Sequence, residues 1–227
     1  MMTIFSGVIA NSLAIAVGGI IGVFLKKGIP ERMNRLITQG LGLCVLYVGI
    51  AGLLKGDNTI VVVLSIVIAA VVGDLLNLDG KLKQLGDFIQ SRVKGKSPIS
   101  EGFVTTSLFV CVGAMAIVGS MESGLSGNHE TLYAKALIDG VLAVILASAM
   151  GIGVALASLS ILVYEGILTL SAGLVSGFLT TPVVNEMTSV GSLLIIAISF
   201  NLLKITDIRV ANLILAPFLP ILLMTIF

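Results

Sequence analysis

Residues 134–181 have the sequence AKALIDGVLAVILASAMGIGVALASLSILVYEGILTLSAGLVSGFLTT, in which only Lys135, Asp139 and Glu165 are charged. One membrane-spanning helix needs about 20 apolar residues, so this run is too long for one helix and suits two. We place the tight turn between these two helices at residues 157–160. The run therefore predicts two apolar membrane-spanning helices. Each of them contains one acid, Asp139 or Glu165, whose place in an apolar helix needs an explanation.

The composition of the whole chain indicates a membrane protein. Its 227 residues are 57% hydrophobic and 11% charged, and the mean hydropathy is +1.15. A soluble core of ordinary composition cannot hold that much apolar surface. Because the apolar runs are long and do not alternate with polar residues, they favour helices over a β-barrel. We predict an all-α fold: a single integral membrane domain over residues 1–227, built as a polytopic transmembrane helix bundle of about eight spanning helices.

The eight predicted helices also give the chain an orientation. They cover residues 4–25, 37–54, 59–78, 102–121, 135–157, 160–180, 188–204 and 210–227. With this count only Lys55 and Lys135, of the 13 Lys and Arg residues, lie on one side of the membrane, and all the others lie on the opposite side. Loops rich in Lys and Arg stay in the cytoplasm. We therefore predict a multi-pass protein of the plasma membrane with both termini outside.

Two further patterns concern the organisation of the chain. The loop at about residues 80–100 places apolar side chains on one helical face among basic residues, which predicts an amphipathic segment on the cytoplasmic membrane surface. This segment is either a plain connector or a lipid-sensing element. Residues 43–52 share Cys, Val, Ile and Gly in register with residues 110–119, and residues 20–25 resemble residues 71–76. These matches suggest internal helix-hairpin repeats, which transporter folds often contain.

Small residues spaced four apart form ridges on three predicted helices. Such ridges let helix backbones approach closely in lipid. They comprise Ser6, Ala10, Ala14, Gly18 and Gly22; Ala143, Ala147, Gly151 and Ala155, headed by Asp139; and Thr169, Gly173 and Gly177, headed by Glu165. An ionised carboxylate facing lipid at mid-depth would cost roughly 2.5 to 3.5 kcal/mol. We therefore expect both acids to point towards neighbouring helices.

The predicted depths separate the two acids. With the turn at residues 157–160, Asp139 lies near the outer boundary and Glu165 near the inner one, roughly 20 Å apart along the helix axes. At that separation the acids are two stations of one ion or proton pathway and not a catalytic pair. The alternative is that Asp139 reaches the lipid headgroups or pairs with Lys135, one helical turn earlier.

Other polar or flexible positions complete the candidate site for a solute or ion. Asn11 lies in the outer third of the first helix, at the level of Asp139, and Asn201 lies in the inner third of the seventh. A buried amide either holds helices together or coordinates a solute. Gly113, Gly119 and Ser120 belong to a glycine-punctuated stretch, and Pro217 and Pro220 interrupt the last helix. Broken helices free backbone groups that can bind a substrate.

Several classes of function are disfavoured by the sequence. Cys44 and Cys111 lie in apolar runs and are best explained as packing residues, and His129 has no second ligand type nearby, so we expect no metal site and no cofactor. No basic patch interleaved with aromatic residues indicates a nucleic acid partner. No nucleophile, base and oxyanion arrangement can be assembled, so we do not expect an enzyme.

Several motifs resemble the YqgA/YdfK-like family of bacterial inner-membrane proteins. They are GVIANSLAIAVGGIIG at residues 7–22, CVGAMAIVGS at 111–120, LIDG at 137–140 and RVAN at 209–212, and the resemblance covers essentially the whole chain. The family implies a bacterial inner membrane and a domain of unknown function, sometimes labelled a transport protein, with no established site residues. This chain departs from the family pattern at Glu165, where we expect glutamine, and at Ser199, where we expect glycine. The first departure favours Asp139 over Glu165 as the functional acid.

The leading expectation is a secondary transporter or ion-coupled carrier of a small solute or cation. Asp139 would be its binding carboxylate, with Asn11, Glu165, Asn201, Gly113, Gly119 and Ser120 as further binding candidates. The alternatives are a passive ion channel, which needs a continuous polar pore, and a non-transporting membrane scaffold or sensor. The first-helix ridge would also allow a homo-oligomer within the lipid bilayer.

Overall fold

The computed structural model describes residues 4–26, 30–81, 84, 99–111 and 114–226. Over these residues the chain forms helices and connecting turns without a strand, which confirms the all-α prediction. The chain divides into two compact units, each built from two separate segments. Unit 1 comprises residues 1–35 and 85–176, and unit 2 comprises residues 36–84 and 177–227. The single membrane domain over residues 1–227 stays a prediction.

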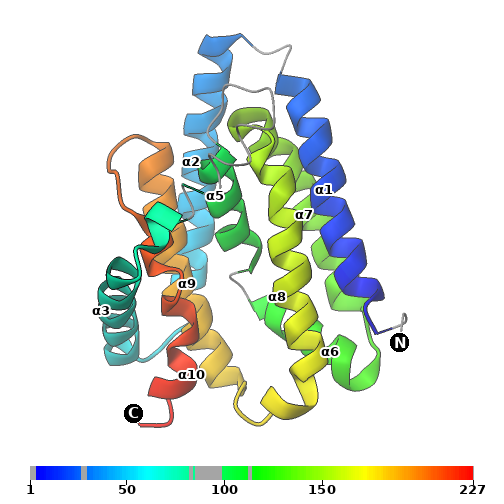
Figure 1. The fold of residues 1–227 in the computed structure, drawn as a ribbon, viewed down its shortest axis with the longest axis vertical. Coiled ribbons are helices and arrows are strands. Elements are labelled where there is room, and N and C mark those ends of the chain that lie inside the picture. The colour runs from blue at the N-terminus through cyan, green and yellow to red at the C-terminus, as the bar shows by residue number, and fades with distance from the viewer. Residues whose placement is uncertain (1–3, 27–29, 82–83, 85–98, 112–113, 227) are drawn as a thin grey trace. The chain divides into compact units, whose positions relative to one another are not determined.

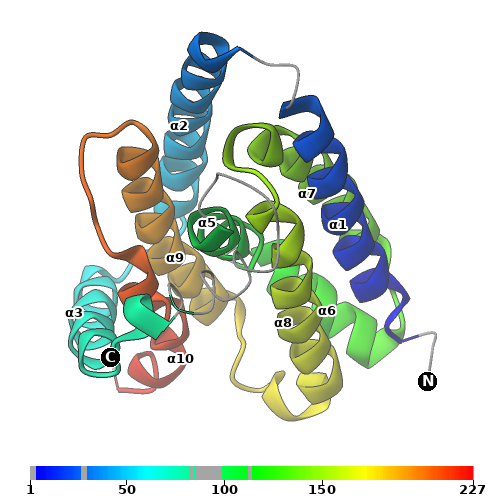
Figure 2. The same ribbon diagram turned by 45° about the horizontal axis from the view of Figure 1, so that its top comes forward.

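Unit 1 is a cluster of helices around the long pair α1 and α7. Figures 1 and 2 both show α1 running beside α7, with α8 next to them. Its helices are α1 (Ser6–Lys26), α5 (Ile99–Cys111), α6 (Ala114–Ser126), α7 (Glu130–Met150) and α8 (Gly153–Val175). The polar residues of the candidate site lie mainly on α1, α7 and α8.

Unit 2 contains most of α2 and the C-terminal part of the chain. Its long helices are α2 (Glu31–Leu53), α3 (Thr59–Leu75) and α9 (Thr181–Leu202), and short helices follow at η1 (Val210–Leu213), η2 (Ala216–Phe218) and α10 (Pro220–Leu223). Both views place α3, α9 and α10 close together (Figures 1 and 2). The predicted last helix is thus divided into short pieces, with Pro217 and Pro220 each in the first turn of a new piece, because proline cannot continue the hydrogen-bond ladder of a preceding helix.

Five helices among the described residues are long and apolar enough to cross a membrane. They are α1, α2, α7, α8 and α9, and a sixth span results if α5 and α6 are counted together, although their axes differ by 61°. The apolar segments Thr59–Leu75 and Val210–Leu223 are shorter. The chain is therefore a multi-pass membrane protein, but the predicted count of eight spanning helices is not confirmed.

The turn between α7 and α8 lies earlier than predicted. Helix α7 ends at Met150 and α8 begins at Gly153, so the predicted turn at residues 157–160 is wrong. Gly151 has a φ of 87°, a left-handed conformation that favours glycine, and its N–H bonds to the carbonyl of Ala147. Glycine at this position is the common way to end a helix.

Many large apolar side chains on the long helices face outwards, while several charged and polar ones are buried. On α7 the exposed positions include Leu137, Ile138 and Val141, whereas Lys135 and Asp139 are buried. In water the opposite arrangement would be expected. In lipid, charged and polar side chains face the bundle interior, so this distribution agrees with a bilayer environment.

Two predicted features are only partly covered by the structure. Most of the amphipathic loop at residues 80–100 lies outside the described residues. Of the suggested repeat, residues 43–52 lie within the continuous helix α2, whereas residues 110–119 include positions 112–113, which are also outside the described residues. The internal repeat stays a prediction.

Candidate functional site

Glycines on α1 bring it close to α7. A Cβ added to Gly18 would collide with the backbone carbonyl of Gly140, and one added to Gly22 would collide with that of Val144. The predicted α1 ridge therefore packs against α7 by backbone contact, as small-residue ridges do in membranes. The predicted ridge headed by Glu165 is correct only for Glu165 and Thr169, which are buried. Among the described residues, added Cβ atoms on Gly173 and Gly177 meet nothing within 4 Å, and Gly177 lies beyond the end of α8.

The close helix packing surrounds a cluster of four polar side chains. Lys135 and Asp139 form a salt bridge one turn apart on α7. The Lys135 Nζ atom lies 3.9 Å from Oε1 of Glu165 on α8, and Asn11 on α1 donates from Nδ2 to the same oxygen at 2.9 Å. The structure thus brings together three of the predicted site residues: Asn11 bonds directly to Glu165, and Lys135 links Glu165 to Asp139.

All four side chains are removed from the surface. The exposed fraction is 0% for Asn11 and Glu165, 5% for Asp139 and 6% for Lys135. Within the described part of the chain, Oε2 of Glu165 and Oδ1 of Asn11 have no hydrogen-bond partner. Buried polar atoms are nearly always hydrogen-bonded, so the two oxygens are acceptors available to an additional group.

The predicted separation of Asp139 and Glu165 is wrong, and the position of the turn explains why. The stretch from Asp139 to Met150 is nearly as long as the stretch from Gly153 to Glu165. Two helices that meet at Gly151 therefore carry both acids to the same level, each about 17 Å from the turn at 1.5 Å per residue. The acids belong to one site and not to the two ends of a pathway.

The remaining predicted site residues lie elsewhere. Asn201 in unit 2 serves its own turn, because Nδ2 donates to the carbonyl of Ile208 and Oδ1 accepts from Thr206 and from the Ile208 N–H. On α6, Ser120 is fully buried and its hydroxyl has no partner, while Gly119 packs against Leu132. Gly113 lies outside the described residues.

Two groups of functional interest were missed by the sequence analysis. Lys135 was considered only as a partner for Asp139, although it also lies close to Glu165. Glu186 was assigned to a loop because the seventh helix was predicted to begin at residue 188. It lies instead in the second turn of α9 and is 3% exposed. The proline at residue 182 was the available signal, because proline is common at the first positions of a helix.

The described part of the chain contains no group of three His, Cys, Asp or Glu side chains arranged as a metal ion requires. Cys44 and Cys111 are unpaired thiols. The cluster on α1, α7 and α8 therefore offers one ammonium group, two carboxyl groups and one amide for chemistry. Such a set can hold and release a proton or a monovalent cation without forming a covalent intermediate.

Comparison with known proteins places the chain in a family of membrane proteins. It is 29% identical to the uncharacterized membrane protein YdfK of Bacillus subtilis strain 168, across 94% of this chain and 93% of that protein. It is 28% identical to the uncharacterized protein YqgA of Escherichia coli K12, across 91% and 90% of the two chains. No solved structure matches with statistical significance. Residues 6–225 match the family described as a protein of unknown function, DUF554, and the chain belongs to that family.

Proposed function

We propose that the protein is an ion-coupled carrier of the bacterial inner membrane, in which Glu165 binds the coupling proton or monovalent cation. One observation carries the proposal: among the described residues, the buried cluster holds two carboxyl groups but one ammonium group. Lys135 is paired directly with Asp139, so Glu165 has an incomplete counter-charge. An uncompensated charge in a buried site is strongly unfavourable. Glu165 therefore takes up a proton or a cation whenever the site is closed.

The partners of Glu165 fit this role. Its Oε1 atom is fixed by Asn11 at 2.9 Å and faces Lys135 at 3.9 Å. Among the described residues, its Oε2 atom and Oδ1 of Asn11 have no partner. When Glu165 is protonated on Oε2, this O–H can donate to Oδ1 of Asn11, and when Glu165 is ionised both oxygens can coordinate a cation. Asp139 holds Lys135 in place and keeps the ammonium group from neutralising Glu165 completely. In this arrangement Glu165, more than Asp139, is the exchanging group.

The complete burial of the cluster favours a carrier over a channel. A passive channel needs a polar path that is open to water, whereas Asn11 and Glu165 are 0% exposed. For an ion to reach Glu165, the packing of the helices around the cluster has to open. A carrier makes such a movement when it exposes its site to each side of the membrane in turn.

Charge movement in reconstituted membranes tests the proposal. Vesicles containing the purified protein are adsorbed to a solid-supported membrane and given single steps of pH, Na⁺ or K⁺. We expect the wild type to give a transient current for at least one of these steps. Glu165→Gln keeps an oxygen for Asn11 but removes the charge, so this variant should give no current.

A matched acid in the same unit provides the control. Glu101 is exposed in the first turn of α5, and Glu101→Gln should keep the wild-type current. Absence of current from the wild type, or an undiminished current from Glu165→Gln, would reject the proposal. A sustained current that follows the electrochemical gradient of one ion would instead identify a passive channel.

A further inference from the structure

A second buried carboxyl group, Glu186, fixes the turn between α2 and α3 in unit 2. Its Oε1 atom accepts hydrogen bonds from the backbone N–H groups of Asp57 at 2.6 Å and Asn58 at 2.8 Å. The other oxygen, Oε2, is buried and has no hydrogen-bond partner among the residues that the structure describes. Glu186 is thus held firmly in position and keeps one acceptor unused.

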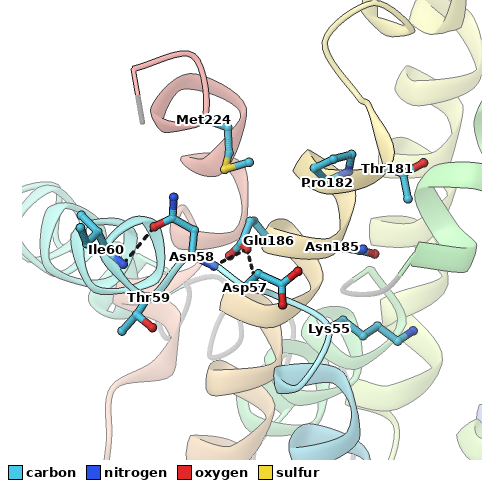
Figure 3. A pocket seen from close by; sticks show the side chains of 10 residues that line it. All are labelled: Lys55, Asp57, Asn58, Thr59, Ile60, Thr181, Pro182, Asn185, Glu186 and Met224. Atoms are coloured by element: carbon cyan, nitrogen blue, oxygen red, sulfur yellow. Dashed lines mark hydrogen bonds between the residues drawn. The ribbon is translucent and has the colours of Figure 1, made fainter.

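Glu186 lies in the wall of a cavity of about 660 Å³, within the range of about 300 to 1,000 Å³ typical of small-molecule sites. Three segments form this wall: the turn that leads into α3, the first two turns of α9, and the chain after α10. Figure 3 shows the side chains gathered around Glu186 and the Asp57–Asn58 turn. The residues that line the cavity are Lys55, Asp57, Asn58, Thr59, Ile60, Thr181, Pro182, Asn185, Glu186 and Met224.

The cavity combines negative and positive groups. Asp57 and Glu186 supply two carboxyl groups, and Lys55 supplies an ammonium group. The N-terminus of α9 adds partial positive charge, since Thr180 makes no side-chain hydrogen bond to cap it. The N-terminus of α3 offers less, because the Asn58 side chain already accepts from the Ile60 and Val61 N–H groups. A ligand that matches this wall carries both an anionic and a cationic group.

The apolar part of the wall narrows the ligand further. Ile60, Pro182 and Met224 are uncharged, so this part of the wall cannot pair with a charged side chain on the ligand. The amide of Asn185 can form a hydrogen bond with a neutral polar side chain on the ligand. In the orientation predicted from the basic loops, the turn before α3, the start of α9 and the C-terminus all lie outside the membrane. On this predicted orientation, the cavity faces solutes that arrive from outside the cell.

We propose that this cavity binds a small zwitterionic solute of the amino-acid type with an uncharged side chain. The ammonium group of the ligand lies towards Glu186 and Asp57, and its carboxylate lies towards Lys55 and the start of α9. This site is separate from the Glu165 cluster. The proposal goes beyond the ion-coupled carrier. It is tested by a binding measurement that does not depend on transport, so the binding proposal and the carrier proposal can fail independently.

Isothermal titration calorimetry on the purified full chain in detergent tests the proposal. The probes are an equimolar pool of the neutral L-amino acids, then each member singly. For a member that binds, the amine without its carboxylate and the acid without its amino group are titrated next. We expect at least one amino acid to bind, and each single-charge analogue to bind at least about tenfold more weakly, because it loses a charge-assisted interaction.

Variants assign the binding to the cavity. Glu186→Gln keeps the acceptor for the Asp57 and Asn58 N–H groups but removes the charge, and Lys55→Gln changes an exposed side chain that the turn does not need. Each should weaken binding at least about tenfold. Asp207→Asn, an exposed acid of unit 2 outside the cavity, should leave binding unchanged.

Three results would overturn the proposal. They are the absence of binding by every amino acid in the pool, equal binding by the amine analogue, which would indicate a site for organic cations, and undiminished binding by Lys55→Gln. The last variant keeps the test valid if Glu186→Gln fails to fold.

Discussion

Asn11 on α1 donates a hydrogen bond of 2.9 Å to Glu165 on α8, across 154 positions of the sequence. This bond ties the first helix to a helix from the middle of the chain at the level where Lys135 and Asp139 form their salt bridge. Because Lys135 also lies 3.9 Å from Glu165, the cluster behaves as one electrostatic unit.

Removal of the excess carboxylate should leave the folded protein at least as stable as the wild type. Glu165→Gln keeps the oxygen that accepts from Asn11 and removes a carboxylate that lacks full compensation. A buried uncompensated charge costs several kcal/mol, so we expect an unchanged or raised Tm in detergent at neutral pH. Glu165→Ala, which also removes the acceptor for Asn11, should lower the Tm. A large fall in Tm for Glu165→Gln would mean that the ionised carboxylate stabilises the fold.

Removal of the ammonium group should destabilise the cluster, and a second substitution should restore it. Lys135→Met leaves Asp139 and Glu165 as two buried acids without a cation, with an expected loss of about 3 to 5 kcal/mol. Asp139→Asn added to Lys135→Met removes one of these acids and should recover part of the loss. Thermal unfolding of both single variants and the double variant gives the coupling. Additive effects would show that the two side chains do not act together.

Packing of α1 on α7 should be sensitive to a single methyl group. The added Cβ in Gly18→Ala would collide with the carbonyl of Gly140, with an expected destabilisation of about 1 to 3 kcal/mol. The Cβ added by Gly173→Ala on α8 meets nothing within 4 Å. This variant should leave the free energy of unfolding unchanged or raise it by up to about 1 kcal/mol. Comparison of the two Tm values checks the helix pairing, and equal values would contradict it.

The predicted orientation places the turn before α3 outside and the end of α9 inside. In a chain with Cys44→Ser and Cys111→Ser, we expect Asp57→Cys to react with a membrane-impermeant maleimide in intact cells. Lys204→Cys should react only after permeabilisation. Both positions are exposed at the ends of helices, so access by the reagent reports the side of the membrane. The reverse pattern would invert the topology and place the zwitterion cavity on the cytoplasmic side.

The sequence was sufficient to predict what depends on composition and spacing. Long apolar runs predicted helices, and the small-residue pattern at Gly18 and Gly22 predicted a close helix contact that the structure confirms. The inward position of Asp139 and Glu165 followed from the cost of a carboxylate in lipid, and both are buried. These inferences need no knowledge of which helices are neighbours.

The arrangement of the site could not be predicted in the same way, because it depends on the position of one turn. No charge or proline marks that turn, and the glycines at 151 and 153 resemble the other small residues of the ridges. Placing it a few residues too late moved Glu165 from the middle of its helix to near the start of the helix. The start of α9 was likewise placed after Glu186, which hid a buried acid in an assumed loop. Small errors in helix ends therefore changed which polar groups meet.

Infrared difference spectroscopy of the reconstituted protein tests most directly whether Glu165 exchanges a proton or a cation. Spectra are recorded as pH is stepped or as Na⁺ or K⁺ is added to a lipid film of the wild type, Glu165→Gln and Glu101→Gln. We predict a change in the carbonyl or carboxylate bands of a buried carboxyl group in the wild type and in Glu101→Gln, and its disappearance in Glu165→Gln. An identical difference spectrum in all three proteins would contradict the account, because Glu165 would then be a fixed structural group.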